Sequence, residues 1–274
     1  MGQAGPMCGR YAASREPAAL VEEFDVEVPP TTDLPARYNI APTNDVYVVR
    51  DGKPDEPARG GFADPPGQTR HRPRRLDVAR WGLVPSWAKD PSIGNRMINA
   101  RAETVAEKPA YRRALSSRRC LLPADGFYEW QAPPEGVLTA AGKKPPKQPF
   151  FLHPADGTGL AMAGLYEWWR DPEVTDDEDP RAWLLSTTII TTAARDNVGQ
   201  IHDRMPVAVL PEQRAAWLDP ETSGKEILAE LLAPSPSGFW DIYPVSTAVN
   251  SVRNQGPQLL EPVELGEGRL PLGD

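Results

Sequence analysis

The sequence predicts an α+β fold in a single domain, with mostly antiparallel β-sheets, a barrel-like core and short flanking helices. The 274 residues suffice for one large domain with a substantial core. Segments typical of strands follow one another in runs rather than in strict alternation with helices. The 32 prolines and 22 glycines cluster between such segments, where surface loops are expected.

Eight segments are rich in the aliphatic, β-branched and aromatic residues that strands prefer. Most of them flank the proline-rich stretches. The expected strands cover residues 45–50, 77–84, 120–130, 148–153, 160–169, 182–192, 205–210 and 239–245.

Four shorter segments are typical of helices. Residues 14–24 begin with serine and carry spaced apolar residues, and residues 108–115 have a proline near the first turn. Residues 211–218 and 224–232 complete the set. The proline-rich stretches 51–68, 131–148 and 171–180 are expected to be surface loops, and none is expected to divide the chain into domains.

Composition excludes several classes of protein. No apolar run approaches 18 residues, and the first dozen residues lack an apolar centre, so we expect a cytoplasmic protein without a membrane span or signal peptide. Two cysteines do not make a disulfide scaffold or a structural zinc site, and nothing requires a metal or an organic cofactor. The net charge of -8 opposes bulk electrostatic coating of nucleic acid, although basic clusters at 69–80 and 110–119 allow a local basic groove.

Cys8 directly follows a second methionine, Met7. Removal of the preceding residues would leave Cys8 with an α-amine and a thiol on adjacent carbons, a pair that no other protein residue offers. A lone cysteine is more often a small buried hydrophobe. Gly9 and Arg10 nevertheless predict an accessible, electropositive setting that favours thiolate. Residues 1–7 are then either an N-terminal extension or the result of a start assigned too early.

His202 and two glutamates are candidates for proton transfer. His202 lies in a turn between a short helix and a strand, where a capping or core role competes with proton shuttling. Glu129 in GFYEW and Glu167 in GLYEW occupy the same place in a weak internal repeat. Aromatic neighbours predict partial burial and a raised pKa for either carboxyl. The pattern alone does not choose between them.

Polar and aromatic residues elsewhere suit ligand binding. Asn99 is either a helix cap or, together with Arg101, part of a site for a polar ligand and a phosphate. Trp81 and Trp87 are singly typical of a core, but beside arginines they also suit stacking on unpaired bases.

An ordered set of motifs extends along most of the chain. It resembles the SOS-response-associated peptidase (SRAP) family from Met7 to Val263, which defines an expected domain over residues 8–263 and a tail over 264–274. The motifs are MCGRY, RYNIAPT (37–43), WGLVPSW (81–87), INARAET (98–104), ADGFYEW (124–130), IHDRMPV (201–207) and VRNQGPQLLEPV (252–263).

The resemblance implies binding to abasic sites in single-stranded DNA and a covalent thiazolidine crosslink through an N-terminal cysteine. It implies that Cys8 is the nucleophile, Glu129 the acid/base group, His202 the proton donor that helps open the sugar, and Asn99 the residue that positions the reacting end. The implied DNA-binding residues are Arg10, Asn39, Pro42, Trp81, Trp87, Arg101 and Arg204.

Two other functions stay open at the level of sequence. One is a cysteine peptidase, including self-processing, with Cys8 as nucleophile and His202 as base. The other is a noncovalent reader of damaged or modified DNA. An uncut extension before Cys8 favours these alternatives, because an amide nitrogen cannot form an imine.

Overall fold

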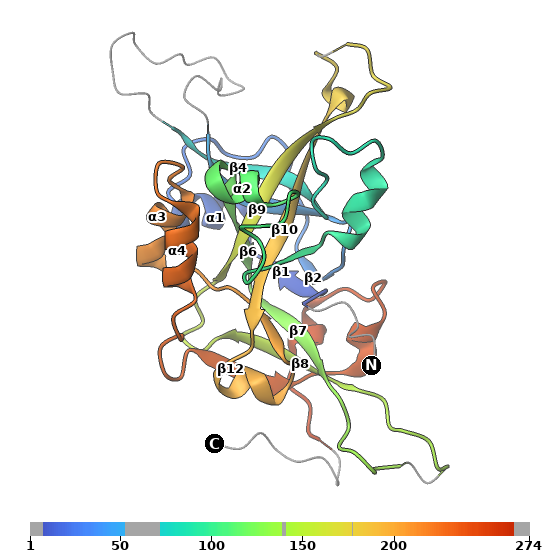
Figure 1. The fold of residues 1–274 in the computed structure, drawn as a ribbon. Helices are drawn as coiled ribbons and strands as arrows, with labels where there is room; N and C mark the ends of the chain where they lie inside the picture. Colours follow the sequence, from blue (N-terminus) through green and yellow to red (C-terminus); the bar gives the residue numbers. More distant parts are fainter. Residues whose placement is uncertain (1–7, 53–71, 139–140, 177, 266–274) are drawn as a thin grey trace.

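The computed structural model describes residues 8–52, 72–138, 141–176 and 178–265 (Figure 1). Over these ranges twelve strands form two sheets, with short α-helices packed beside the larger one. The predicted single-domain α+β class is confirmed, because antiparallel pairs dominate and helices do not alternate regularly with strands. The expected loop at 51–68 falls almost entirely outside the described residues.

The larger sheet closes into a five-stranded barrel. The strand order is β10-β4-β3-β6-β9, and β9 pairs back onto β10. The β4–β10 pair is parallel, and the other four pairs are antiparallel. Closure removes the open edges that would otherwise attract other strands. The barrel strands are β3 (Asp45–Asp51), β4 (Arg74–Trp81), β6 (Arg119–Ala124), β9 (Leu160–Arg170) and β10 (Trp183–Ala193).

The carboxyl end of β10 carries two additional short strands. β5 (Asn99–Arg101) runs parallel to it and β11 (Arg204–Pro206) antiparallel. Thr191 pairs with both, so β5 and β11 lie on opposite edges of β10. The predicted strand at 205–210 is therefore shorter than expected, and Asn99 begins a strand instead of capping a helix.

The smaller sheet is fully antiparallel, in the order β12-β8-β7-β1-β2. β1 lies between β2 and β7, which places the first described residues inside the sheet. Strands of three and four residues carry too little alternation to be predicted, and neither β1 nor β2 was expected. The strands are β1 (Tyr11–Ala13), β2 (Arg37–Ile40), β7 (Gly126–Gln131), β8 (Gln148–Pro154) and β12 (Trp240–Pro244).

The chain changes sheets at Asp125. The sequence predicts one strand over 120–130, but β6 belongs to the barrel and β7 to the smaller sheet. The Asp125 N–H donates to the Ala12 carbonyl at 2.7 Å, and its carboxylate accepts the Ser14 N–H at 2.8 Å. A Cβ at Gly126 would lie 2.5 Å from the Leu152 carbonyl oxygen, so the crossing requires glycine.

The four predicted helices are present, and each is shorter than expected. They are α1 (Pro17–Glu23), α2 (Arg112–Ser117), α3 (Arg214–Leu218) and α4 (Gly224–Leu231). Proline occupies the first turn of α1, and the Ser223 hydroxyl caps α4. Short 3-10 helices are η1 (Pro91–Arg96), η2 (Pro180–Ala182), η3 (Asp196–Gln200), η4 (Pro211–Gln213), η5 (Thr247–Asn250) and η6 (Pro257–Leu260).

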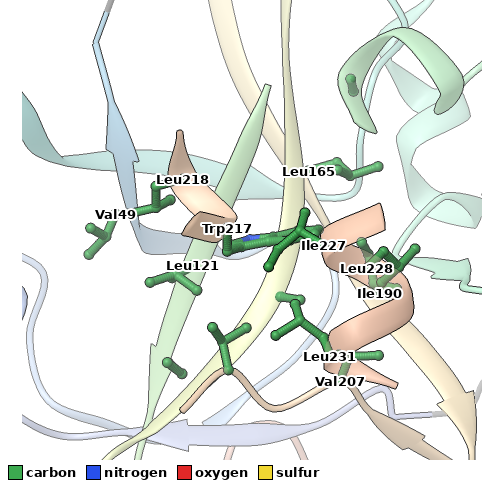
Figure 2. Close-up of a cluster of buried hydrophobic side chains, with 14 of the residues drawn as sticks. Val49, Leu121, Leu165, Ile190, Val207, Trp217, Leu218, Ile227, Leu228 and Leu231 are labelled. Atoms are coloured by element: carbon green, nitrogen blue, oxygen red, sulfur yellow. The ribbon is translucent and has the colours of Figure 1, made fainter. Parts of the chain in front are cut away.

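Helices α3 and α4 cover the barrel through one apolar cluster, centred on Trp217 in Figure 2. Trp217 is fully buried, and its indole N–H donates to the Cys120 carbonyl at 2.8 Å. The indole thus buries a large apolar surface while its polar atom stays satisfied. Its labelled neighbours in the cluster include Val49, Leu121, Leu165, Ile190, Ile227 and Leu231.

A buried arginine ties these helices to β6. The Arg119 guanidinium lies against the Trp217 ring and donates only to main-chain carbonyls. It thereby satisfies carbonyls near the ends of α2 and α3 that have no partner within their own helices. The acceptors are Leu115, Ser116, Trp217, Asp219 and Thr222.

We expect Arg119→Met to lower the free energy of unfolding by about 3–5 kcal/mol, because it leaves buried carbonyls unpaired. Urea denaturation measures this loss. Arg112→Met, at an exposed position of α2, should change stability by no more than about 0.5 kcal/mol. Equal effects of the two substitutions would contradict the role of Arg119.

Candidate active site around Cys8

Cys8 lies just before β1 and is 3% exposed. Its φ of 43° falls in the left-handed region, which costs a residue other than glycine about 1–3 kcal/mol. Such a conformation persists only where surrounding contacts hold it. The contacts at Cys8 come from β7 and from β11.

Glu129 reaches Cys8 from the neighbouring strand β7. Its Oε1 atom accepts a hydrogen bond of 2.7 Å from the Cys8 main-chain nitrogen. That nitrogen belongs to the Met7–Cys8 peptide bond, and it stands where an α-amine would lie in a chain beginning at Cys8. Burial raises the pKa of the Glu129 carboxyl, while His202 and the Cys8 hydrogen bonds partly oppose the rise. A buried carboxyl of raised pKa suits proton exchange near neutral pH.

His202 is half-buried at the end of the η3 turn. Its Nδ1 atom lies 3.1 Å from the Arg204 main-chain nitrogen and 3.0 Å from Asp203 Oδ1, and these contacts require opposite protonation of Nδ1. We assign Nδ1 as the acceptor, because the Arg204 N–H is sheltered and needs a partner, whereas the exposed Asp203 carboxylate can bind water. The proton of the neutral ring then resides on Nε2.

The Cys8 thiol differs from the sequence-based prediction of a thiolate. Burial raises its pKa well above the ordinary value, and the adjacent Glu129 carboxylate raises it further. Sγ lies 3.9 Å from the Arg204 carbonyl oxygen, to which the thiol donates. Arg10 was expected to supply positive charge, but its guanidinium binds Asn39 and the Val249 carbonyl instead. The site therefore holds a neutral thiol.

The two glutamates of the internal repeat have different surroundings. Glu129 contacts Cys8, whereas Glu167 lies in the barrel strand β9 and forms a 2.7 Å ion pair with Arg118. This geometry distinguishes two carboxyls that the sequence pattern left equivalent.

Asn99 and Arg101 are the first and last residues of β5, so their side chains share one face of that strand. Asn99 is half-buried and Arg101 is exposed. Thr191 connects them to β11, because it pairs with Arg101 and accepts bonds from Arg204 at 2.7 Å and 3.2 Å. β5 is thus one strand away from the segment that contacts Cys8.

Arg10 and Asn39 form a clamp on the C-terminal segment. Arg10 Nη1 donates to Asn39 Oδ1 at 2.7 Å and to the Val249 carbonyl at 2.9 Å. The buried Asn39 amide nitrogen lies within 3.1 Å of the carbonyl oxygens of Val249, Ser251 and Asn254. Asn39 therefore holds main chain together beneath the site in this structure.

The remaining predicted binding residues are dispersed. Trp81 is fully buried in the core and donates to the Ile98 carbonyl at 2.9 Å. Trp87 is 62% exposed. Pro42 is half-buried in the turn between β2 and β3, and Arg204 is 8% exposed with its guanidinium bound to Glu103. Among the four, Trp87 presents a large apolar surface to solvent.

Two neighbours of the site were not selected from the sequence. Trp130 follows Glu129, and its ring lies 5.6 Å from the Arg10 guanidinium carbon while its indole donates to Asn250. Glu103 pairs with Arg204 from the turn after β5. Trp130 lies in the motif GFYEW and Glu103 in the motif INARAET. Their position inside these motifs could have marked them as candidate site residues.

Comparison with known proteins gives a consistent result. A model of the SOS response associated peptidase (SRAP) family matches residues 7–252. The chain belongs to the SRAP family. It is 36% identical to the abasic site processing protein YoqW of Bacillus subtilis, over 93% of this chain and 99% of that protein. It is 33% identical to the abasic site processing protein YedK of Escherichia coli, over 94% and 100%. The abasic site processing protein HMCES of Gallus gallus shares 38% identity over 70% of this chain and 59% of its own.

Solved structures support the fold of this SRAP family member. A Bacteroides thetaiotaomicron protein superposes with a TM-score of 0.72 at 22% identity, covering 94% of this chain and all of its own. A phage-related protein from Bordetella bronchiseptica gives 0.60 at 28% identity, covering 87% and 94%. Within the described ranges, no helix is both long and apolar enough to cross a bilayer, and no cluster of His, Cys, Asp and Glu is arranged as a metal site.

We expect Glu129→Gln to be more stable than the wild-type protein, by an amount that increases as pH rises. The raised pKa means that Glu129 supports the fold while protonated, and that this support is lost as pH rises through the folded-state pKa. The variant minus wild-type free energy of unfolding should grow as pH rises from the ordinary glutamate pKa of about 4.3 to the raised folded-state pKa, by about 1.4 kcal/mol per unit by which that pKa is raised. Urea titrations at several pH values measure it.

The exposed Glu107→Gln is the matched control and should give a flat difference across the same pH range. A difference for Glu129→Gln that does not vary with pH would contradict the raised pKa.

Proposed function

We propose that this protein captures abasic sites in single-stranded DNA by forming a thiazolidine between Cys8 and the opened sugar. The observation that carries the proposal is the Cys8 nitrogen held 2.7 Å from a buried carboxyl, with the Cys8 thiol and His202 beside it. Relatives named abasic site processing proteins, at 33–38% identity, support the choice of substrate.

The chemistry requires both groups of an N-terminal cysteine. The α-amine attacks the aldehyde carbon of the opened sugar, and loss of one water gives an imine. The sulfur then adds to the imine carbon, and its proton passes to the nitrogen, which closes a five-membered ring. The product contains protein and DNA less one water. An amine with a pKa of about 7.7–8.0 is partly neutral in the cell and can begin the sequence.

Each site residue has a role in these steps. Glu129 removes a proton from the attacking nitrogen and returns it to the departing water, which its raised pKa favours. His202, with its ring proton on Nε2, donates to the sugar oxygen as the ring opens. Because the thiol is neutral, its proton is transferred as the sulfur adds, so a preformed thiolate is not required. Asn99 positions the reacting sugar.

Capture requires that the residues before Cys8 be removed. We propose that the working chain starts at Met7 and that Met7 is then excised, since a small residue follows it. The family model's match also begins at residue 7. With the Met7–Cys8 peptide bond intact, the nitrogen is an amide and does not form an imine.

A second activity, self-removal of residues 1–7, has one observation in its favour. Glu129 contacts the nitrogen of the Met7–Cys8 bond, which is the leaving nitrogen if that bond is cleaved. A protonated Glu129 could supply the proton that this nitrogen needs on departure. The Cys8 sulfur would attack the Met7 carbonyl carbon and form a thioester as the carbon–nitrogen bond breaks, and the thiol proton would pass to the bulk solvent. Water would then hydrolyse the thioester, which releases residues 1–7 as a carboxylic acid and restores the Cys8 thiol.

We propose that exposed groups around the site hold the DNA strand. Arg101 contacts a backbone phosphate, Arg10 adds positive charge beside it, and Trp87 offers an aromatic surface to an unpaired base. Arg204, paired with Glu103, contributes to the DNA-binding region by holding the main chain below it. Asn39, Pro42 and Trp81 support this surface from within.

Intact-mass spectrometry tests the proposal. Protein beginning at Cys8, mixed with single-stranded DNA that holds one abasic site, should gain the DNA mass less one water and keep it after denaturation. Cys8→Ser should form no stable ring, because the hydroxyl is the poorer nucleophile. Equally stable adducts from both proteins would contradict the thiazolidine. No adduct with undiminished DNA binding would favour a noncovalent reader.

Glu129→Gln should slow adduct formation about 100-fold at saturating DNA, within the usual range for loss of a general acid–base group. Glu167→Gln should react at close to the wild-type rate, because Glu167 is paired with Arg118 away from Cys8. Single-turnover gel assays measure both rates. The opposite ranking would assign the chemistry to Glu167.

Arg101→Ala should weaken DNA binding and reduce the slope of log K against log salt concentration by about 0.7 for one lost contact to single-stranded DNA. Fluorescence anisotropy at several salt concentrations gives the slope. An unchanged slope would contradict the phosphate contact.

A further inference from the structure

The main chain of Arg204 connects the two reactive side chains of the site. Its N–H donates to His202 Nδ1 at 3.1 Å, and its carbonyl oxygen accepts from Cys8 Sγ at 3.9 Å. One residue therefore orients the imidazole and the thiol together. A rotation of either peptide plane next to Arg204 would misplace one of them.

The Arg204 N–H and carbonyl do not take part in the hydrogen bonds between β10 and β11. The Ala194 N–H donates to the Asp203 carbonyl, and Arg204 lies opposite Ala193, the next residue along the ladder. In an antiparallel pair, hydrogen-bonded and non-hydrogen-bonded positions alternate. Arg204 accordingly directs its N–H and carbonyl away from β10 and towards the site.

The side chain of Arg204 is anchored instead. Both terminal nitrogens bind the Glu103 carboxylate, and Nη2 also donates to the Thr191 carbonyl at 2.7 Å and hydroxyl at 3.2 Å. A bidentate arginine–carboxylate pair adds geometric specificity as well as energy, so it fixes the orientation of the guanidinium. Arg204 is mostly buried, which limits the screening of this pair by water.

The charge of Glu103 responds to this contact. The hydrogen bond from Arg204 lowers the pKa of the Glu103 carboxyl, so it stays ionised near neutral pH. Glu103 is half-exposed, and within the described residues its carboxylate bonds to Arg204 and not to Cys8, Glu129 or His202. Arg204 is therefore the contact through which Glu103 can hold the site residues in place.

We propose that Glu103 is a positioning residue: its ion pair with Arg204 fixes the main-chain groups that hold the His202 tautomer and the Cys8 thiol. The consequence for reaction rate rests on the proposed function, whereas the consequence for the His202 tautomer does not. The buried Arg204 contacts His202 and Cys8 through its main chain, and Glu103 fixes the orientation of its side chain.

The test compares Glu103→Gln with Glu107→Gln, an exposed carboxyl of the same loop. Nitrogen-15 NMR of the histidine rings at pH 8 reports the tautomer, and a His202→Gln spectrum assigns the signal among the three histidines. Wild type and Glu107→Gln should show an excess of the Nε2–H form. Glu103→Gln should lose that excess. An unchanged tautomer ratio in Glu103→Gln would overturn the proposal.

The rate gives a second readout. At saturating abasic-site DNA, Glu103→Gln should form adduct about tenfold more slowly, a loss typical of a small misplacement of reacting groups. Noncovalent affinity, measured by anisotropy in a Cys8→Ala background, should change less than about twofold, because Glu103 is not a DNA contact. Equal losses of rate and affinity would overturn the proposal by making Glu103 part of the binding surface.

Glu103→Asp separates positioning from folding. It keeps the charge but shortens the side chain, so its rate and tautomer ratio should lie between those of wild type and Glu103→Gln. If Glu103→Gln does not fold, wild-type values in Glu103→Asp overturn the proposal and intermediate values support it. If wild type forms no adduct, the proposed function fails while the tautomer comparison still decides the role of Glu103.

Discussion

The hydrogen bond between the Cys8 nitrogen and the Glu129 carboxyl is the contact on which the arrangement of the site depends. It joins a residue before β1 to a residue of β7, and the antiparallel pairing of those strands fixes its length. That pairing requires the chain to leave the barrel at Asp125, where Gly126 allows the close approach of Leu152. The contact between Cys8 and Glu129 therefore depends on the point at which the chain leaves the barrel and enters the smaller sheet.

Electrostatics around this contact explain why the site can be both stable and reactive. A carboxyl and a thiol are buried together, and burial opposes ionisation of each. His202 lies near the Glu129 carboxyl and partly offsets the rise in its pKa, and the Arg204 carbonyl accepts a hydrogen bond from the thiol. The site thus holds a protonated thiol and a carboxyl of raised pKa next to each other.

The sequence predicted elements with a strong local pattern and missed those defined by contacts distant in the chain. Long strands such as β9 and β10 carry enough apolar residues to be recognised, and all four helices were located. The division of residues 120–130 between two sheets depends on Leu152 and Ala12, which no local pattern contains. β1, β2 and β5 are too short to show a periodicity.

The same distinction applies to the site. Motif order placed Cys8, Glu129 and His202 among the candidates, and the structure brings these three together. The sequence could not show that Arg10 turns towards Asn39, and so it predicted a thiolate where burial keeps the thiol protonated. Trp81 and Asn39 have residue types that suit ligand contact, but their burial is a property of the folded chain.

The burial of Cys8 also bears on biosynthesis. Its enclosing contacts come from Glu129, 121 residues later, and from Arg204, 196 residues later. Asn39 donates to main-chain carbonyls that lie more than 200 residues later in the chain. The N-terminus leaves the ribosome before any of these partner residues has been synthesised. Cys8 therefore stays accessible while the chain is being synthesised and becomes enclosed only when the β7 and β11 segments have folded around it.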